Sequence, residues 1–237
     1  LIMYSALKNY LILAILGGFS ILAIIFFVSA LIYPTLPNIS HLEKYYPKQP
    51  LQIYSKDEVL IAEFGEERRD FIAISETPQQ MINAILSIED RRFFEHPGID
   101  IIGITRAALK NISGKRHEGA STITMQVARN FFLTSEKTLK RKINEILLAI
   151  KIERTLSKEE ILELYVNQIY LGQRSFGFAA AANTYFGKNL DQLNLGETAL
   201  LAGLPKAPSR YNPLVRPHLA IKRQQDVLNS MLRHGYI

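Results

Sequence analysis

Glu89 is the first candidate for chemistry in this 237-residue sequence. It opens the segment EDRRFFEHPGID and falls at the C-terminal end of a helix predicted to begin near Pro78. The partial negative charge of a helix end disfavours a second negative charge, so we expect the pKa of Glu89 to be raised. A carboxylate in this position is a better general base than an ordinary surface glutamate. Taken alone, the segment fits a helix end with solvated charges equally well.

A second segment, GASTITMQVARN from Gly119 to Asn130, combines a glycine, several hydroxyl groups and the start of a predicted helix. The free backbone N–H groups of a helix start suit a phosphate. Thr122 and Gln126 are spaced i and i+4 and share one helical face. Arg129 and Asn130 fall at i+7 and i+8 and continue that face. By itself this pattern also fits a capped helix with a solvated polar stripe.

A third segment, KTLKRKINE, places Arg141 and Glu145 at i and i+4 on one helical face. Such pairs are usually surface ion pairs. The nucleophile-elbow, zinc-protease, P-loop and dinucleotide-binding motifs do not occur in the sequence. The five histidines are scattered without the spacing of a metal site, so a zinc site is not expected.

Charge and hydropathy point toward a membrane. The 28 Lys and Arg against 22 Asp and Glu give a formal net charge of +6, which favours an anionic partner. Leu11 to Ile32 carries no charge and, as a helix, spans about 33 Å, roughly one bilayer core. A cleaved signal peptide and a buried core helix are the weaker alternatives; the apolar stretch of a signal peptide has only roughly 7–15 residues. We therefore expect a transmembrane helix over residues 11–33, after a short segment 1–10, and rank lipid phosphates above nucleic acid as partner.

The rest of the sequence predicts a short β element and then a helical domain. Residues 34–75 read as a linker with a hairpin, whose strands Leu51–Tyr54 and Val59–Phe64 flank a polar turn. From Pro78 onward the apolar residues follow the helical period. Residues 76–237 are therefore expected to form one mainly α domain.

Capping residues signal the helix boundaries in this domain. Thr77 precedes Pro78, which is favoured at the first helical position, and Ser157 precedes Glu160 in the pattern of a capping box. The last helix is expected to run from His218 to His234. Further helical patterns lie near residues 101–112, 121–132, 137–155, 158–171 and 176–185.

Taken together and in order, these segments resemble the motifs of the family 51 glycosyltransferases, which occur in class A penicillin-binding proteins and in monofunctional peptidoglycan transglycosylases. Three later stretches resemble further family motifs: KEEILELYVNQIYLG from Lys158, AAANTYFGK from Ala180 and LPKAPSRYNP from Leu204. The resemblance covers roughly residues 53–237, and EFGEERR from Glu63 points to the 1A-type subgroup.

The resemblance implies a mainly α, lysozyme-like fold of two lobes, with one N-terminal transmembrane helix and a small β-hairpin. It implies a peptidoglycan glycosyltransferase that polymerises lipid II into β-1,4-linked glycan strands, with inversion and release of undecaprenyl pyrophosphate. The implied partners are lipid II, the nascent glycan strand, the lipid bilayer and other cell-wall synthesis proteins, with no nucleic acid. The implied location is the bacterial inner membrane, single-pass, with the catalytic domain on the periplasmic side.

The resemblance also assigns roles to residues. Glu89 matches the general base of the family, and Glu145 matches its second catalytic carboxylate. Glu145 is placed near the leaving pyrophosphate, where it would orient cations or hold a divalent ion such as Mg²⁺ or Mn²⁺; no other cofactor is implied. The residues implied for substrate binding are Asp90, Phe93, His96, Ser121, Thr122, Gln126, Arg129, Asn130, Arg141 and Lys142.

Two places in the sequence depart from the family pattern. Arg129 stands where many relatives carry lysine, and Gln173–Gly177 departs from a more glycine-rich loop. Arginine binds phosphate in a bidentate way, so function is expected to survive the first change.

The loop Asn111–Glu118 is expected to close over the donor.

Other functions share parts of this pattern. A lysozyme-like glycan hydrolase needs two carboxylates, or one acid with substrate assistance, rather than a basic cluster at 126–145. An inactive membrane-anchored scaffold would need neither Glu89 nor Glu145, and both are present. The only Ser-x-x-Lys match is Ser5 to Lys8, before the predicted span, so no transpeptidase domain is expected here. The chain is expected to be a domain of a longer protein or a monofunctional enzyme.

Overall fold

The computed structural model describes residues 16–20, 23, 26–27, 29–42, 51–58, 60–65, 67–112, 119–134, 136 and 138–237, in two compact units, Leu1–Asn38 and Ile39–Ile237. In the first unit, helical backbone at residues 29–32 leads into the short turn Tyr33–Thr35. Of the predicted membrane helix, residues 16–20, 23, 26–27 and 29–32 are described and have helical backbone, and the rest, apart from Tyr33, lies outside the described residues. None of the described helices is both long enough and apolar enough to cross a bilayer. Residues 113–118, which are all but the first two residues of the loop expected over the donor, also lie outside the described residues.

The second unit contains the predicted hairpin. Strand β1 (Leu51–Tyr54) pairs antiparallel with β2 (Leu60–Phe64), and Leu51 lies opposite Phe64. The turn between them is closed by a hydrogen bond from the N–H of Glu58 to the C=O of Ser55 at 3.0 Å. The two strands and their polar turn are therefore confirmed.

The predicted helices of this unit are present in the predicted order, together with a helix, α8 (Leu195–Gly203), that was not predicted. They are α2 (Gln79–Glu89), α3 (Ile101–Ile112), α4 (Ile123–Phe132), α5 (Leu139–Glu153), α6 (Lys158–Gln168), α7 (Phe178–Phe186), α8 and α9 (Pro217–Arg233). Ser157 and Glu160 form the predicted capping box of α6. Pro78 does not take the expected first helical position. It is the N-cap of α2, because its ψ of 133° is not helical.

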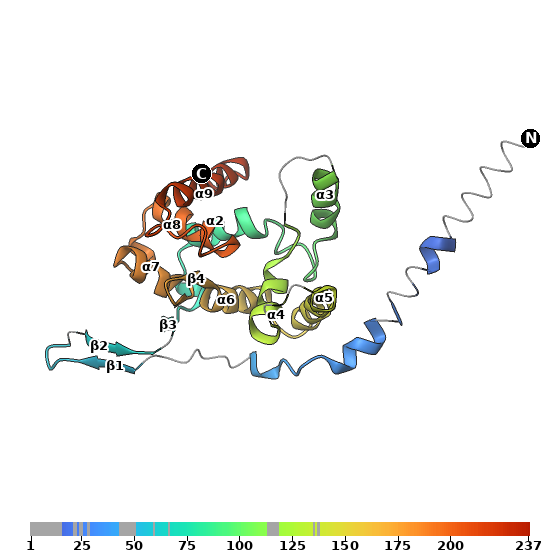
Figure 1. The fold of residues 1–237 in the computed structure, drawn as a ribbon, viewed down its shortest axis with the longest axis horizontal. Helices are drawn as coiled ribbons and strands as arrows, with labels where there is room; N and C mark the ends of the chain where they lie inside the picture. Colours follow the sequence, from blue (N-terminus) through green and yellow to red (C-terminus); the bar gives the residue numbers. More distant parts are fainter. Residues whose placement is uncertain are drawn as a thin grey trace, which may run out of the picture. The chain divides into compact units, whose positions relative to one another are not determined.

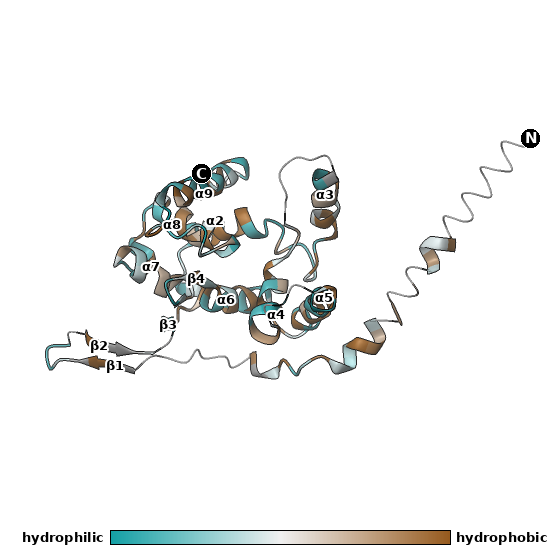
Figure 2. Ribbon diagram, viewed as in Figure 1, coloured by the Kyte–Doolittle hydropathy of each residue, from teal (hydrophilic) through white to brown (hydrophobic). Residues whose placement is uncertain are grey.

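The helices fall into two packed groups (Figure 1). Helices α2, α8 and α9 pack against one another, and α4 packs against both α5 and α6. Helix α7 contacts one helix of each group, α6 and α8. Most of these helices carry both apolar and polar residues along their length (Figure 2), as expected of helices that bury one side. This arrangement confirms the expected mainly α fold of two lobes.

A small sheet joins segments that are distant in the sequence, and it was not predicted. Its order is β3 (Arg68–Arg69), β5 (Ser175–Phe176), β4 (Tyr170–Gly172), with β3 parallel and β4 antiparallel to β5. The helical pattern expected over residues 158–171 therefore stops at Gln168, because the following residues pair as a strand. Strands of two or three residues are too short for hydropathy periodicity to reveal.

Side chains of α6 fix the segment that leads into α2. Asn167 binds both backbone groups of Ile72: its Oδ1 accepts the N–H at 2.9 Å, and its Nδ2 donates to the C=O at 2.8 Å. Glu163 accepts the N–H of Ile74 at 2.8 Å. These hydrogen bonds set where the chain enters α2, and therefore where Glu89 lies at its end.

Gly177, the N-cap of α7, is expected not to tolerate a side chain. Its φ of 86° and ψ of 158° fall in a region nearly restricted to glycine, and an added Cβ would lie 2.8 Å from the backbone oxygen of Asn167. Gly177→Ala is expected to lower the free energy of unfolding by about 3 kcal/mol or more. Gly187→Ala is the control, with φ of 62° but open space around the Cβ, and an expected loss of about 1–2 kcal/mol. Denaturant titration measures both, and equal losses would contradict the prediction.

Candidate functional site

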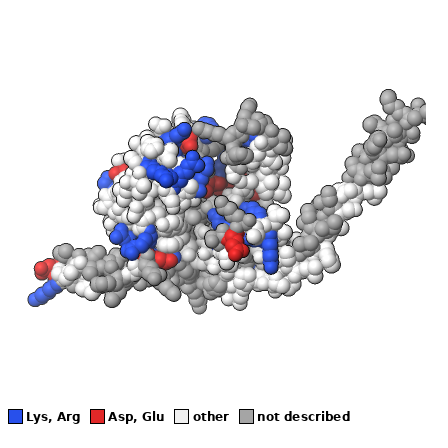
Figure 3. Space-filling model, viewed as in Figure 1, with Lys and Arg blue, Asp and Glu red and all other residues white. Residues whose placement is uncertain are grey.

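The end of α2, the start of α4 and part of α9 surround a cavity of about 560 Å³. Eight Lys and Arg side chains line it, against three carboxylates. In the view of Figure 3, Lys and Arg atoms lie beside acidic atoms at a recess in the surface. This excess of cations favours an anionic ligand. The predicted site residues that line the cavity are Glu89, Asp90, Ser121, Thr122, Gln126 and Arg129.

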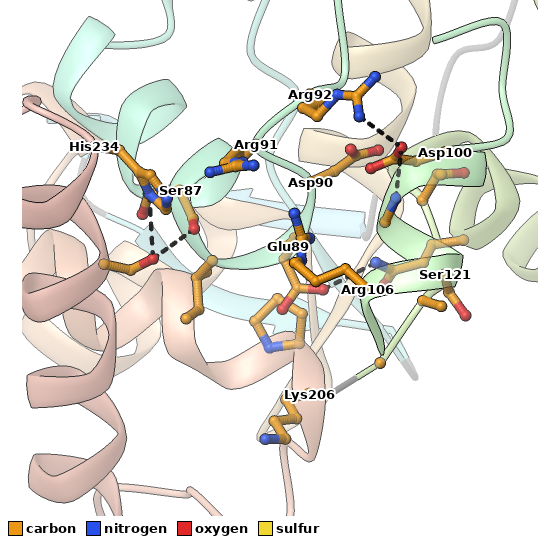
Figure 4. A pocket seen from close by; sticks show the side chains of 18 of the residues that line it. Ser87, Glu89, Asp90, Arg91, Arg92, Asp100, Arg106, Ser121, Lys206 and His234 are labelled. Atoms are coloured by element: carbon orange, nitrogen blue, oxygen red, sulfur yellow. Dashed lines mark hydrogen bonds and ion pairs between the residues drawn. The ribbon is translucent and has the colours of Figure 1, made fainter. Parts of the chain in front are cut away.

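Glu89, the last residue of α2, faces this cavity (Figure 4), and its side chain is 13% exposed. Its Oε2 accepts a hydrogen bond from Gln126 Nε2 at 2.9 Å, and its Oε1 lies 3.7 Å from Arg223 Nη2. Burial raises the pKa of Glu89, while the hydrogen bond from Gln126 and then nearby cations, Arg223 first, oppose the rise. The expected direction is confirmed, but its main cause is burial rather than the end of the helix.

Sequence analysis did not identify Arg223, although it has the largest effect of the nearby cations on the pKa of Glu89. It lies on α9 in the same buried row as Ala220, Val227 and Met231. Its Nε donates to the C=O of Gly203 at 3.1 Å. An arginine within the apolar row of a helix was the available signal, because a buried cation requires a partner.

Asp90 and His96 hold the loop after α2 against the start of α4. The Nε2 of His96 lies 3.0 Å from both carboxylate oxygens of Asp90. The Nδ1 of His96 accepts the N–H of Gly98 at 3.2 Å, so the ring hydrogen is on Nε2 and points to Asp90. Asp90 Oδ2 also accepts the N–H of Ile123 at 3.0 Å. Both side chains are buried and act on protein groups.

At the start of α4, two of the N–H groups that were expected for a phosphate are bonded to the protein. The N–H of Ile123 is bonded to Asp90, and the N–H of Met125 is bonded to Thr122 Oγ1 at 3.2 Å. The hydroxyl of Thr122 donates in turn to the C=O of Gly98 at 2.7 Å. Thr122 is thus a buried helix cap, and the capped-helix alternative applies to this end of the helix.

Phe93 and His96 do not line the cavity. Phe93 is fully buried, so the structure gives it a packing role in place of the expected direct contact with substrate. The Nζ of Lys158 lies 4.5 Å from the centroid of its ring and donates to the C=O of His96 at 2.7 Å. Both residues therefore support the loop next to Glu89.

Glu145 of α5 is enclosed by cations and is only 1% exposed. Its Oε2 lies 2.9 Å from Lys142 Nζ. Its Oε1 lies 3.5 Å from Arg141 Nε and 4.0 Å from Arg129 Nη1. Lys142 also donates to Ser121 Oγ at 2.9 Å. The predicted Arg141–Glu145 pair is therefore not an ordinary surface ion pair, because its carboxylate is buried and gathers three cations.

Four buried polar atoms of α4 and α5 have no hydrogen-bond partner within the described part of the chain. They are Asn130 Nδ2, Arg141 Nε, Asn144 Oδ1 and Glu145 Oε1. Two of these atoms are donors and two are acceptors, so a polar group between the helices could satisfy them. Asn130 and Arg141 were predicted as binding residues, whereas Asn144 was not.

Helix α4 connects the two glutamates. Gln126 bonds to Glu89 of α2, and Arg129, about one turn further along α4, reaches Glu145 of α5. The charge of Arg129 also acts on Glu89. The spacing of polar residues on α4 therefore did indicate the face that joins both carboxylates. The cations of the cavity that were not predicted are Arg91, Arg92, Arg106, Lys110, Lys206, Arg223 and Arg233.

Glu145 does not fit a metal ion held by the protein alone. Its contacts described above are with cations, which repel a divalent ion. Among the described residues, no group of three His, Asp or Glu side chains could hold a metal. A divalent ion at a bound pyrophosphate would take its ligands mainly from the substrate oxygens. Metal dependence stays a prediction.

Glu89→Gln is expected to stabilise the protein at neutral pH. Because the pKa of Glu89 is raised on folding, its contribution to stability is full below the unfolded-state pKa and falls as pH rises through the folded-state pKa. A neutral amide avoids that loss, and we expect the thermal midpoint to rise by roughly 2–4 °C, the effect of about 1 kcal/mol in a domain of this size. The gain should vanish near pH 4. Glu95→Gln, at an exposed glutamate paired with Arg92, is the control and should change little.

Asp90→Asn is expected to destabilise the protein. The amide removes the negative charge and turns one carboxylate oxygen, 3.0 Å from His96 Nε2, into an NH₂ donor that faces the ring hydrogen, so we expect a loss of roughly 1.5–3 kcal/mol. Urea unfolding measures this loss. Asp191→Asn, at an exposed aspartate, is the control and should stay within about 0.5 kcal/mol of wild type. Similar small changes in both variants would show that the junction does not depend on the charge of Asp90.

Comparison with known proteins gives a consistent set of relatives. Penicillin-binding protein 1A of Neisseria gonorrhoeae is 56% identical over 206 residues, which cover 86% of this chain and 26% of the relative. Penicillin-binding protein 1A of Escherichia coli K12 is 50% identical over 235 residues, 97% of this chain and 27% of the relative. The crystal structure of penicillin-binding protein 1A from Haemophilus influenzae is 33% identical, with a TM-score of 0.46, over 81% of this chain and 19% of that one.

The chain spans about a quarter of the length of these curated relatives. The family model described as transglycosylase matches residues 57–232, which is well over half of the chain. The match includes the segments around both Glu89 and Glu145. The chain therefore belongs to the transglycosylase family, as its ordered motifs indicated.

Proposed function

We propose that this chain is a peptidoglycan glycosyltransferase that polymerises lipid II into glycan strands. The observation that carries the proposal is the position of Glu89, a largely buried carboxylate of raised pKa at the wall of a cavity rich in cations. The transfer of a sugar from a pyrophosphate carrier requires a base for the attacking hydroxyl and cations for the departing phosphates. The cavity supplies both.

In the proposed reaction, Glu89 accepts the proton of the 4-hydroxyl of the acceptor sugar. The hydroxyl oxygen forms a bond to C1 of the donor sugar on the face opposite the leaving group, which inverts C1 and makes a β-1,4 linkage. The bond between C1 and the pyrophosphate oxygen breaks, and undecaprenyl pyrophosphate leaves with the electron pair. The proton on Glu89 then passes to solvent, which restores the base.

The cations around Glu145 are the proposed site for the leaving pyrophosphate. Glu145 holds Arg141 and Lys142 in place before substrate arrives, so little reorganisation is needed when negative charge develops. Removal of one such preorganised donor typically costs about 3 kcal/mol in the barrier. Asn130 and Ser121 add uncharged polar groups beside these cations.

The geometry argues against a lysozyme-like hydrolase. Such an enzyme needs a second free carboxylate or substrate assistance. Asp90 is engaged by His96 and Ile123, and Asp100 accepts the N–H of Gly103 at 2.9 Å and lies 3.3 Å from Arg92. Glu145 is enclosed by cations. Among the carboxylates described at this site, Glu89 alone keeps a chemical role.

The location and partners belong to the same proposal. The uncharged residues 11–33 would anchor the chain in the bacterial inner membrane, with the catalytic domain on the periplasmic side, where lipid II and the growing strand are available. Other cell-wall synthesis proteins are the expected protein partners. A divalent ion, if required, would accompany the pyrophosphate.

The test is glycan polymerisation from purified lipid II in detergent, with wild type and Glu89→Gln at equal concentration. We expect polymer from wild type and a rate lowered by about 10²–10⁴ in the variant, the usual contribution of a general base. The wild-type rate should fall as pH decreases through the raised pKa of Glu89. Glu95→Gln, on the exposed side of the neighbouring loop, should keep the wild-type rate.

Other outcomes would separate the alternatives. Equal activity of wild type and Glu89→Gln would remove Glu89 from its role. Soluble products from preformed glycan would favour the hydrolase, and no activity of the folded wild type on either substrate would favour the scaffold. The expected stability gain of Glu89→Gln distinguishes loss of the base from loss of the fold.

A further inference from the structure

A second group of positive charges lies in the part of the cavity next to the end of α9. It consists of Arg91 after α2 and of Arg233 at the end of α9, next to His234, and the charge of Arg106 on α3, which lines the same cavity, also acts on His234. Figure 4 shows His234 and Ser121 on opposite sides of Glu89, with Arg91 between Glu89 and His234. Because Ser121 contacts the Lys142 of the Glu145 cluster, the two cationic groups lie on different sides of Glu89.

The positive charges of this group act on His234. Partial burial and then the charges of Arg91, Arg233 and Arg106 lower the pKa of His234, and a hydrogen bond with the backbone of Ser230 opposes the shift. Three guanidinium groups from three elements therefore act on one imidazole. Within the described residues, no carboxylate forms an ion pair with Arg91 or Arg233. Like charges gathered in this way favour a bound anion.

A chain of hydrogen bonds orients the ring of His234. The hydroxyl of Ser230 donates its hydrogen to the C=O of Ser87 at 2.6 Å. The Nδ1 of His234 lies 3.5 Å from the same Ser230 oxygen, at the outer limit of a hydrogen bond. When the ring is protonated, both of its nitrogens carry a hydrogen, and Nε2–H can donate to a ligand.

We propose that Arg91, Arg233 and His234 form a second anion subsite, which binds a phosphate group carried by a lipid. The phosphate belongs either to a lipid-linked sugar or to a phospholipid headgroup, and Arg106 completes the positive surroundings. The subsite rests on the proposed function only for the identity of its ligand, since binding requires no transfer reaction. An ordinary solvated basic surface needs no oriented imidazole among the guanidinium groups.

The subsite couples anion binding to proton uptake. In the empty subsite, partial burial and then the neighbouring cations lower the pKa of His234, so the ring stays neutral to lower pH than usual. A bound phosphate cancels part of that positive charge and accepts a hydrogen bond from Nε2–H, so the bound state favours the protonated ring. Affinity for the anion should therefore increase as pH falls through the titration of His234.

The experiment follows the titration of His234 by NMR in the 237-residue chain, labelled with ¹³C-histidine and held in neutral detergent. His234→Gln assigns the resonance. The midpoint is measured with and without inorganic pyrophosphate at constant ionic strength, and it should move to higher pH when pyrophosphate is present. His218, exposed on the same helix and outside the cavity lining, is the internal reference and should not move.

Variants then locate the ion. Arg91→Gln and Arg233→Gln should each bind pyrophosphate about tenfold more weakly, the usual effect of losing one charge-assisted hydrogen bond. Both arginines are exposed, so their loss should not unfold the protein, which circular dichroism checks. Lys222→Gln removes an equal charge from the exposed side of α9 and should bind as wild type does. Wild-type affinity in both arginine variants would place the ion elsewhere and overturn the proposal.

Lipid bilayers separate the two sources of phosphate. The protein is placed in nanodiscs of phosphatidylcholine alone or with added phosphatidylglycerol. A rise of the His234 midpoint with phosphatidylglycerol, before any pyrophosphate is added, assigns the subsite to a headgroup. A rise of the His234 midpoint only after pyrophosphate is added excludes the headgroup and leaves a lipid-linked sugar as the source of the phosphate. An unchanged midpoint in every condition would overturn the subsite, whatever the outcome of the polymerisation assay.

Discussion

The hydrogen bond from the N–H of Ile123 to Asp90 joins the end of α2 to the start of α4, and the geometry of the site depends on this junction. Asp90 directly follows Glu89, so fixing one carboxylate sets the direction in which the other leaves the helix. Ile123 begins α4, so the same bond sets the position of Gln126 one turn later. The 2.9 Å contact between Gln126 and Glu89 follows from both constraints. His96 and Phe93 are part of this support.

The two glutamates have opposite electrostatic environments, and this difference separates their roles. Glu89 is largely buried with one neutral donor and a cation at 3.7 Å, so burial dominates and proton binding is favoured. Glu145 is also buried, but three cations lie within 4.0 Å of its oxygens. A carboxylate so compensated can hold cations in place, whereas in the proposed reaction Glu89 accepts a proton. The stability lost by burying Glu89 is the kind of strain that active sites commonly retain.

Local signals in the sequence predicted what depends on neighbouring residues. The capping box at Ser157 placed the start of α6, and hydropathy placed Glu89 at the end of α2. Helical spacing indicated the face of α4 that carries Gln126 and Arg129. Each of these features rests on contacts within one helix or along one helical face, and periodicity and capping report such contacts well.

Features formed between distant segments escaped prediction. Arg223 approaches Glu89 only because α9 packs on α2, and its charge gave no hint of that partner. The sheet of β3, β4 and β5 joins strands too short to show a period. Asp90 and Thr122 accept the N–H groups of Ile123 and Met125, so tertiary contact and capping occupy two of the donors that were expected for a phosphate, and the phosphate site there stays a prediction. Burial, rather than the helix end, likewise controls the pKa of Glu89.

The packing of α9 on α2 also has a consequence for the order in which the protein matures. A polypeptide is synthesised from its N-terminus, and domains fold as their residues become available. Glu89 emerges long before Arg223, and until α9 docks, the carboxylate remains open to water on the side where the cavity will form. The cation that lies 3.7 Å from Glu89 and the wall of the cavity that α9 supplies are therefore added late in synthesis, after the other described helices of this unit.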